Sequence, residues 1–374
     1  MKKNIKIIFK SIMFICFSLC LIIIYYQHHY STFKQLKKLN YTPKGINLIM
    51  KNNLDNYLLK TKIYSKTLET ALTKDLYLKK YLHDYVFFEY KNYDKYIEHL
   101  NTLKDRGYKN DEINIILEFL TEEDLDLILK ETKDYLDFTP FLTSNYFLSK
   151  NIIRYINYQD KYQLDYEETI NKVNMNLDYP FYTNYKIIED PFNNLVLVNK
   201  YHKLPSDFIP QDLTSLISAC SINQDILVTK TLKKKFEEMC LDIKNLNLNI
   251  KVISGYRSYQ TQEDLYNKYY QKDGTLADDY SARPGFSEHQ TGLAVDIYNE
   301  ELPFTKFKNT PEYQWVKNNA HRYGFIIRYP KDKEDITGYK EEPWHLRYLG
   351  EEIATYLYEH HLTYDEYYTQ FIKK

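Results

Sequence analysis

The sequence has no excess of charge of either sign. Among its 374 residues, 50 Lys and Arg stand against 51 Asp and Glu, which gives a formal net charge of -1. Contacts with nucleic-acid phosphates call for a basic surplus, so this balance argues against a nucleic-acid partner. The length suffices for about two domains, at roughly 100–200 residues each.

Motifs of several common hydrolases are also absent. No H-E-x-x-H occurs, so the helix that defines thermolysin-like metal sites is missing. There is no G-x-S-x-G, and no S-x-x-K followed by S-D-N and K-T-G, which excludes serine hydrolases of those kinds. Hydrolytic chemistry in this chain would need a different set of residues.

A long run without charge lies near the N-terminus. Ser11–Tyr26 contains no charged residue, and four lysines precede it. A spanning helix needs about 20 residues, and the run approaches this length if its two tyrosines lie at the interface. The lysines predict a cytoplasmic tail over 1–10, a transmembrane signal anchor over 11–26 and an extracytoplasmic remainder, in a single-pass protein of the cell membrane. A cleaved signal peptide is the alternative, but no small-x-small site follows.

Cysteine is scarce, with four in the chain. Cys16 and Cys20 lie within the apolar run and are most simply apolar filler. Cys220 and Cys240 fall in the part predicted to be exported, where a disulfide is permitted. Two cysteines in a large domain do not make a disulfide framework, so free buried thiols are an equal alternative.

Residues 27–190 have the texture of short helices. The stretch KNDEINIILEFL at 109–120 places apolar residues at i, i+3, i+4 and i+7. Thr121 and Asp124 then have the spacing of a capping box for a second helix. The region is therefore predicted to be helical.

A faint internal similarity runs through the same region. Tyr41–Ile49 and Tyr108–Ile116 share a Tyr, an Ile-Asn pair and an Ile, and Tyr166–Val173 resembles a degenerate third copy. Such similarity predicts degenerate helical-hairpin repeats. A stalk or packing module is the favoured role, and a binding module is the alternative.

A change of pattern follows Pro180 and Pro191, which interrupt the helical texture. Apolar runs that read as strands lie at 194–199, 249–254, 292–298 and 325–330, and helical patterns lie at 260–270, 311–324 and 350–361. This mixture predicts an α+β domain over 191–374, with a small antiparallel sheet and flanking helices.

The strand predicted over Leu293–Ile297 contains a carboxylate. Its apolar residues alternate onto one face, which leaves Asp296 on the other. Burying a carboxylate there is costly unless it is paired or bound to a metal. Gly292 permits a sharp turn that could bring His289 back toward Asp296. The pair forms half of a zinc site, and a structural His–Asp hydrogen bond is the alternative.

The remaining groups of such a site occur in EEPWHLRYLG at 341–350. A catalytic zinc usually takes three protein ligands and leaves a fourth position for water. His345 is a suitable third ligand, and Glu342 is a suitable base. A straight strand would point these two side chains to opposite faces, so a bend near Pro343 is required.

Together these residues resemble a known signature. The pattern Ser287-x-His289-x-x-Gly292-x-Ala294-x-Asp296, followed by Glu342-x-x-His345, is similar to that of the LAS metallopeptidases, and within them to the VanY-type D-alanyl-D-alanine carboxypeptidases, peptidase family M15B. SGYRSYQTQ at 254–262 is similar to the family's YRSxxxQ element. The resemblance covers roughly residues 195–361.

The resemblance implies a role for each residue of the pattern. It implies a Zn²⁺ ion held by His289, Asp296 and His345, with Glu342 as general base. It also implies that Arg257 stabilises the charge that develops on the scissile carbonyl. A surface salt bridge is the alternative role for Arg257.

The implied reaction is removal of the C-terminal D-Ala from peptidoglycan stem peptides. Ser287, Gln262 and Arg283 are candidate substrate contacts, although Ser287 could instead orient the ligand loop and Gln262 could be a solvated helix residue. An L,D-carboxypeptidase on tetrapeptide stems and a D,D-dipeptidase are alternatives with the same chemistry. A non-catalytic cell-wall-binding protein is an alternative of another class, and the intact Glu342 and Arg257 argue against it.

Overall fold

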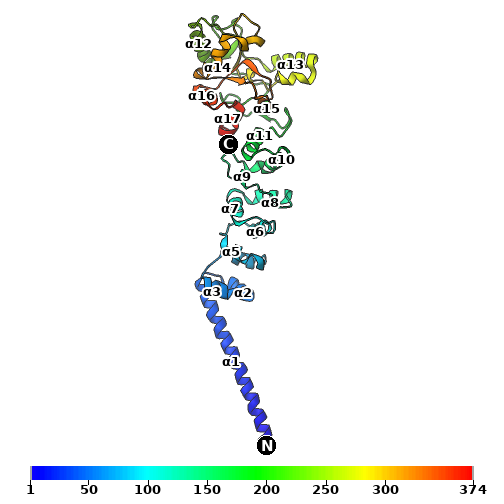
Figure 1. Cartoon of the computed structure of the whole chain (residues 1–374), viewed down its shortest axis with the longest axis vertical. Coiled ribbons are helices and arrows are strands. Elements are labelled where there is room, and N and C mark those ends of the chain that lie inside the picture. The colour runs from blue at the N-terminus through cyan, green and yellow to red at the C-terminus, as the bar shows by residue number, and fades with distance from the viewer. Residues whose placement is uncertain (1, 373–374) are drawn as a thin grey trace. The chain divides into compact units, whose positions relative to one another are not determined.

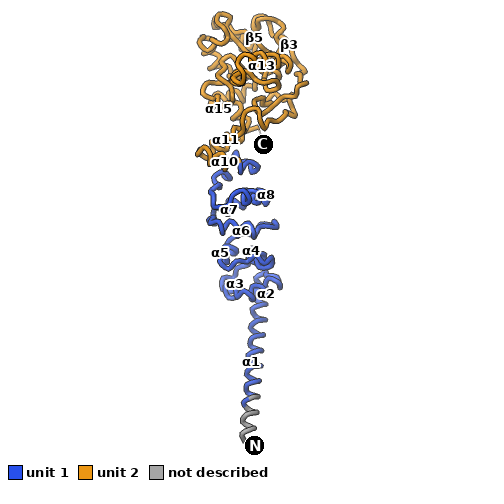
Figure 2. The backbone as a smooth tube through the Cα atoms, turned by 90° about the vertical axis from the view of Figure 1, so that its right-hand side faces the viewer, with its two compact units in different colours: residues 1–153 blue, residues 154–374 orange. Residues whose placement is uncertain are grey.

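The computed structural model describes the backbone of residues 2–372, together with the side chains of Lys10 and of residues 12–372. Apart from Lys10, the lysine side chains on which the predicted cytoplasmic tail depends lie outside the described residues. The chain divides into two compact units, residues 1–153 and residues 154–374 (Figure 2). The predicted domain limit near residue 190 is a different boundary and stays a prediction.

The first unit consists of helices and the segments that connect them. In chain order these are α1 (Lys2–Lys38), α2 (Pro43–Lys51), α3 (Asp55–Thr61), α4 (Lys66–Thr73), η1 (Lys79–Tyr81), α5 (Leu82–Phe87), α6 (Tyr96–Asp105), α7 (Asn110–Phe119), α8 (Glu122–Glu131), α9 (Thr139–Leu142) and η2 (Ser149–Asn151) (Figure 1).

The second unit mixes helices and strands. Its elements are α10 (Ile152–Tyr162), which begins at the unit boundary, α11 (Tyr166–Asn174), β1 (Lys186–Ile187), β2 (His202–Lys203), β3 (Leu213–Ser215), β4 (Leu227–Thr229), α12 (Lys230–Lys244), β5 (Lys251–Ser254), α13 (Tyr259–Asp273), η3 (Gly274–Asp279), η4 (Glu288–Thr291), β6 (Ala294–Tyr298), η5 (Phe304–Asn309), α14 (Pro311–Asn319), η6 (Ala320–Tyr323), β7 (Phe325–Tyr329), α15 (Glu334–Thr337), β8 (Glu342–Tyr348), α16 (Glu351–His360), α17 (Tyr364–Tyr367) and η7 (Tyr368–Ile372).

Helix α1 contains the predicted membrane segment. Its part Ile12–Lys38 is long and apolar enough to cross a membrane. Large apolar side chains there, such as Phe14 and Ile24, are exposed. A signal sequence passes the same test of length and composition, so the anchor stays a prediction.

Local sequence signals predict the apolar face of α7 and the start of α8. The apolar stripe of α7 is buried at Ile113 and Ile116. Thr121 accepts a hydrogen bond from the backbone of Asp124, whose carboxylate accepts from the backbone of Thr121. The predicted capping box is therefore confirmed, because it depends only on groups three residues apart.

The two clearer repeat copies share a tyrosine hydrogen bond as well as sequence identities. Tyr41 and Tyr108 are both buried just before a helix. The Tyr41 hydroxyl donates to Ile63 O at 3.1 Å, and the Tyr108 hydroxyl donates to Leu136 O at 2.8 Å. Each tyrosine thus ties its helix to a later segment. The repeat itself, including Tyr166–Val173, stays a prediction.

Four antiparallel strands form the main sheet of the second unit, in the order β5-β6-β8-β7. One face of the sheet packs on α12. Leu293, Val295 and Ile297 share this core with Phe236 of the helix, and burial of each such side chain contributes about 1.5–3 kcal/mol. The predicted alternation is therefore confirmed, and Asp296 belongs to the opposite face.

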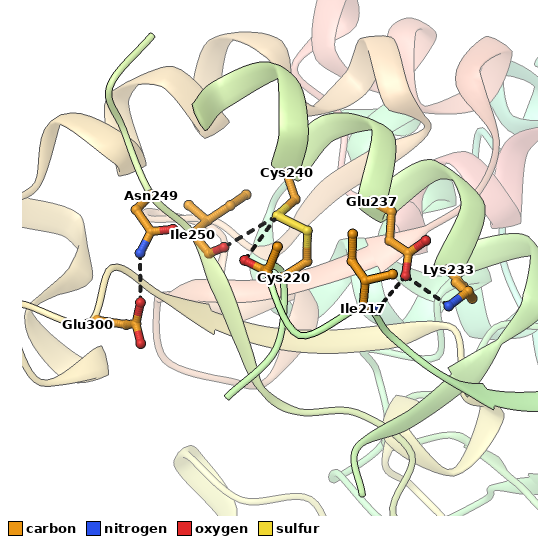
Figure 3. The surroundings of a disulfide bond; sticks show 9 residues. Ile217, Cys220, Lys233, Glu237, Cys240, Asn249, Ile250 and Glu300 are labelled. Atoms are coloured by element: carbon orange, nitrogen blue, oxygen red, sulfur yellow. Dashed lines mark hydrogen bonds and ion pairs between the residues drawn. A yellow bond between two sulfur atoms is a disulfide. The ribbon is translucent and has the colours of Figure 1, made fainter. Parts of the chain in front are cut away.

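A disulfide adds a covalent link to this core. Cys220 and Cys240 of α12 are bonded, with their Cα atoms 6.0 Å apart (Figure 3). Both are buried among the apolar residues that pack on the sheet. Of the two alternatives that the sequence leaves open, the structure shows the bonded one.

The strand predicted over 194–199 is not found in this described part of the chain. These residues form turn and coil, and Asn199 makes only an isolated bridge with His202. Val196 and Val198 are nevertheless buried in a small apolar cluster. The Arg347 guanidinium donates to Val196 O. This carbonyl therefore has a hydrogen-bond donor without a neighbouring strand. Burial in this cluster explains why the segment is apolar although it does not pair as a strand.

Candidate active site

The register of β6 and β8 places two candidate ligands side by side. Asp296 pairs directly with His345 across these antiparallel strands. Residues directly opposite each other point to the same face of a sheet. Asp296 Oδ1 accordingly lies 3.2 Å from His345 Nδ1, on the face away from α12.

The third candidate ligand comes from η4, which precedes β6. Gly292 ends this short helix with φ +67°, a left-handed conformation that favours glycine. The turn brings His289 Nε2 to 3.2 Å from Asp296 Oδ2. The other ring nitrogen, Nδ1, lies 2.7 Å from Gly255 O. A carbonyl can only accept, so Nδ1 carries the proton and Nε2 offers its lone pair.

An irregularity in β8 brings Glu342 to the same place. Between the pairs Ile327–Leu346 and Tyr329–Glu342, β7 advances two residues while β8 advances four. This shift is the bend that the spacing of Glu342 and His345 requires. Glu342 Oε2 lies 3.6 Å from His345 Nδ1.

These side chains form a group that could hold a metal ion. One ligand atom from each of His289, Asp296 and His345 lies within 4.8 Å of the others. Within the described part of the chain, His289 Nε2 and Asp296 Oδ1 are buried without a hydrogen bond of acceptable geometry. Buried polar atoms without partners are rare, so the donor set fits a cation bound between them.

Arg257 lies beside this group, in the loop between β5 and α13. Its backbone N–H donates to His289 O at 3.2 Å, and its guanidinium NH2 is 3.7 Å from Asp296 Oδ2. The NH1 group donates to Gln262 Oε1 at 3.0 Å. Gln262 in turn donates to Ala282 O at 2.7 Å. Both ends of the Gln262 amide are therefore engaged within the protein.

A cavity of about 510 Å³ opens onto the group. Besides the residues above, its lining includes Ser287 and the aromatic rings of Tyr269, Tyr280 and Trp344. Arg283 is not among the lining residues. Its guanidinium instead binds Asp278, with Nε–Oδ1 2.9 Å and NH2–Oδ2 2.8 Å. The structure thus brings together every predicted site residue except Arg283.

Burial shifts the titration of the central groups. It raises the pKa of Glu342 to about 7. It lowers the pKa of His289 to about 4, so this imidazole is neutral at pH 7. Burial also acts to lower the pKa of His345, but the adjacent carboxylates of Asp296 and Glu288 raise that pKa to about 9. The two imidazoles therefore have opposite electrostatic surroundings.

Sequence reasoning missed a set of charged residues behind the site. Glu288, Arg328, Arg347 and Asp365 are all buried. The signal was available for two of them, because Arg328 and Arg347 interrupt the apolar strands FIIRY and EPWHLRY. An isolated charge in an apolar strand is the same anomaly that singled out Asp296.

Known proteins match the part of the chain that contains this site. The family model of VanY, D-alanyl-D-alanine carboxypeptidase, matches residues 225–351. YodJ of Bacillus subtilis (strain 168) is 40% identical over 194 residues, which cover 50% of this chain and 71% of that protein. VanXYC of Enterococcus gallinarum, a bifunctional D-Ala-D-Ala dipeptidase and D-Ala-D-Ala carboxypeptidase, is 34% identical over 165 residues, covering 42% of this chain and 84% of that protein.

A solved structure, that of the LdcB LD-carboxypeptidase, is also similar. It shares 39% sequence identity over 50% of this chain and 91% of that chain, with a TM-score of 0.48. The sequence matches define an enzyme of the hydrolase class, a metallocarboxypeptidase. Within that class, the chain belongs to the VanY family of D-alanyl-D-alanine carboxypeptidases.

Proposed function

We propose that the chain is a zinc-dependent D,D-carboxypeptidase that removes the C-terminal D-Ala from peptidoglycan stem peptides. The convergence of His289, Asp296 and His345 with Glu342 and Arg257 at one cavity carries the proposal. Relatives named for D-Ala-D-Ala carboxypeptidase activity support the choice of substrate.

His289 Nε2, a carboxylate oxygen of Asp296 and His345 Nδ1 would hold the zinc ion. Two imidazoles and one carboxylate are typical of catalytic zinc, and they leave a fourth position open. When bound, zinc supplies a Lewis acid that lowers the pKa of a water molecule to about 7 and polarises a carbonyl. The neutral state of His289 makes its lone pair available for this role.

Glu342 would act as the general base. Its carboxylate is buried, faces the ligand group and has a pKa raised to about 7. A base with a pKa close to the working pH can accept a proton from the attacking water and then deliver it to the leaving amine. The bend in β8, which brings the carboxylate to 3.6 Å from His345 Nδ1, supports this role.

Arg257 would face the oxyanion of the tetrahedral intermediate. The guanidinium is already oriented by Gln262, so little reorganisation accompanies charge development. Gln262 is thus assigned to holding Arg257 rather than to contacting substrate. Ser287, at the cavity wall, remains the candidate contact for the substrate carboxylate.

The proposed location of the enzyme rests on helix α1. We assign its apolar part as a single-pass anchor, with the catalytic unit outside the cell membrane, where peptidoglycan lies. The helical region 27–190 would serve as a stalk. Protection of the catalytic unit from a protease added outside intact cells would contradict this orientation.

Hydrolysis of defined stem peptides tests the activity. The full chain in detergent is incubated with pentapeptide or tetrapeptide stems, with zinc, with a chelator, and with a chelator followed by excess zinc. We expect D-Ala release from the pentapeptide that is lost with chelator and restored by zinc. Turnover of the tetrapeptide alone would replace the D,D assignment by an L,D one, and release from neither would refute the proposal.

A Glu342→Gln variant provides the matched control for the base. We expect kcat to fall by about 10²- to 10⁴-fold, while zinc content, measured by atomic absorption, stays at the wild-type level. An active Glu342→Gln enzyme would refute the assignment of Glu342, and loss of zinc would show that the residue holds the metal instead.

A further inference from the structure

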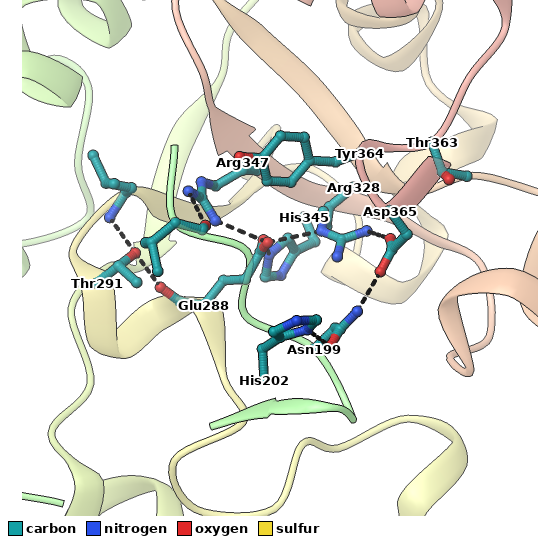
Figure 4. Close-up of polar contacts among 12 residues, drawn as sticks. Asn199, His202, Glu288, Thr291, Arg328, His345, Arg347, Thr363, Tyr364 and Asp365 are labelled. Atoms are coloured by element: carbon teal, nitrogen blue, oxygen red, sulfur yellow. Dashed lines mark hydrogen bonds and ion pairs between the residues drawn. The ribbon is translucent and has the colours of Figure 1, made fainter. Parts of the chain in front are cut away.

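Four buried charged residues form a network directly behind the candidate ligands. Glu288 lies on η4, Arg328 on β7, Arg347 on β8 and Asp365 on α17 (Figure 4). Their side chains are at most 3% exposed. Burying charges is expensive, so a network at this depth calls for a physical reason beyond surface solvation.

Both arginines contact the same oxygen of Glu288. Arg328 Nε donates to Oε1 at 2.7 Å, and Arg347 NH1 donates to Oε1 at 2.9 Å. Arg328 NH1 also donates to Asp365 Oδ2 at 2.6 Å, which holds this guanidinium from its far side. Rotation of the Glu288 carboxylate would break two charge-assisted hydrogen bonds. The carboxylate is therefore fixed in orientation.

The second oxygen of Glu288 faces a candidate metal ligand. Oε2 lies 3.4 Å from His345 Nε2, and in the described part of the chain neither atom has a closer hydrogen-bond partner. The opposite ring nitrogen, Nδ1, faces Asp296 and Glu342. The His345 ring thus lies between the charge network and the cavity, and Figure 4 shows it beside the Glu288 carboxylate.

His289 provides the internal comparison. Its Nδ1 donates to a neutral backbone carbonyl, Gly255 O, and its Nε2 points to the ligand group. His345 uses the opposite nitrogens, and its outer partner is a carboxylate. A carbonyl and an ionised carboxylate both accept one N–H, so each fixes which nitrogen keeps a lone pair.

We propose that Glu288 is a positioning residue that keeps the proton of His345 on Nε2 and thereby presents the Nδ1 lone pair to the metal. The hydrogen bonds from Arg328 and Arg347 hold the carboxylate in the orientation that this task needs. The inference rests on the proposed zinc site. Glu288 and His345 form a carboxylate–histidine pair in which Glu288 acts through His345 and does not contact substrate.

Zinc affinity of a Glu288→Gln variant tests the proposal. The full chain in detergent is stripped of metal, and its zinc affinity is measured by competition with a chelator of known affinity. Loss of an outer partner of this kind typically weakens metal binding by about 10- to 100-fold. We expect a loss of that size for Glu288→Gln. Unfolding of the metal-free protein is followed in parallel by tryptophan fluorescence.

Asp365→Asn is the matched control. Asp365 binds the same Arg328 from the far side and contacts Asn199, but not His345. The Asp365→Asn substitution should lower the melting temperature of the metal-free protein while leaving zinc affinity at the wild-type value. If Asp365→Asn weakens zinc binding as much as Glu288→Gln does, the network is merely structural and the proposal is overturned.

A measurement on the unmodified protein covers the case in which Glu288→Gln fails to fold. In ¹⁵N-histidine spectra of the zinc-loaded chain, with His345 assigned by loss of its signals in His345→Gln, we expect the proton on Nε2. A proton on Nδ1 would overturn the proposal. Absence of zinc binding by the wild-type chain would instead refute the proposed function, so the two failures are distinguishable.

Discussion

Among the described residues, the most deeply buried ion pairs lie in the second unit. In the first unit, the ion pair between Lys95 and Asp126 is exposed, with side-chain exposures of 47% and 42%. In the second unit, the pair between Arg328 and Asp365 has exposures of 1% and 3%. Surface pairs contribute little to stability, whereas buried charges incur a large desolvation penalty that only good partners offset.

The two units also differ in the side chains that form their cores. The core of the first unit consists largely of Ile, Leu and Tyr side chains, for which burial alone is favourable. The second unit has such a core on one face of its sheet only. On the other face it buries acids, bases and guanidinium groups around the candidate ligands. One of these buried acids, Glu288, lies 3.4 Å from the candidate ligand His345.

The largest effect should come from breaking the buried network. Replacement of Arg328 by Met leaves Asp365 without its guanidinium partner and Glu288 with only one, so the free energy of unfolding should fall by about 3–5 kcal/mol. Trp315 and Trp344 are the two tryptophans of the chain and both belong to the second unit. Tryptophan fluorescence in a urea titration of the full chain therefore reports on this unit.

Arg322→Met is the control for that measurement. Arg322 is an exposed arginine of the same unit, with a 3.3 Å hydrogen bond to Asn319. Its replacement should leave the urea midpoint unchanged. Equal midpoints for the Arg328 and Arg322 variants would contradict the contrast between the two units, because burial would then not distinguish these charges.

A smaller effect, on catalysis instead of stability, is expected at Arg257. Arg257→Met should lower kcat by about 10²- to 10³-fold, equivalent to about 2.7–4 kcal/mol of transition-state stabilisation. Its zinc content should not change, because Arg257 is not a ligand. Initial rates of D-Ala release, measured over a range of pentapeptide concentrations, separate kcat from KM.

Arg283→Met is the matched control here. Arg283 is paired with Asp278 and lies outside the cavity lining. We expect its kcat and KM to stay close to the wild-type values. A rise in KM for Arg283→Met would restore the substrate contact that the sequence suggested for it and would show that the loop moves when substrate binds.

Local signals in the sequence were sufficient for several of these features. Asp296 was identifiable because a carboxylate in an apolar strand is anomalous whatever surrounds it. The capping box at Thr121 and the turn at Gly292 likewise depend on groups only a few residues apart. Glu342 and His345 were also identifiable, as a suitable base and a suitable third ligand, but no periodicity could show that they converge on His289. The family pattern supplied that expectation.

Features that depend on contacts between distant segments could not be predicted from the sequence. Glu288 adjoins His289 in the sequence and reads as one more loop carboxylate, until the strand register brings Arg328 and Arg347 to it. The strand predicted over 194–199 was wrong for the same reason. The Arg347 side chain of β8 donates hydrogen bonds to carbonyls of this segment, in place of a neighbouring strand. Pairing partners are properties of the assembled sheet and not of any window of sequence.

The smallest effect should come from the first unit, at Lys95. Lys95→Ala removes an exposed charge whose pairing is screened by salt and opposed by side-chain entropy. Asp126 keeps its contact with His99 Nε2 at 2.9 Å. Hydrogen exchange of α6 peptides in the full chain, read by mass spectrometry, should therefore show no change in protection.

Leu100→Ala in α6, the helix that Lys95 directly precedes, provides the reference for this last comparison. Leu100 is fully buried, and truncation of such a side chain costs about 2–5 kcal/mol, so protection of the α6 amides should fall clearly. If Lys95→Ala reduces protection as much as Leu100→Ala does, the first unit also depends on its charges. The contrast between an apolar unit and a unit built around buried ions would then be incorrect.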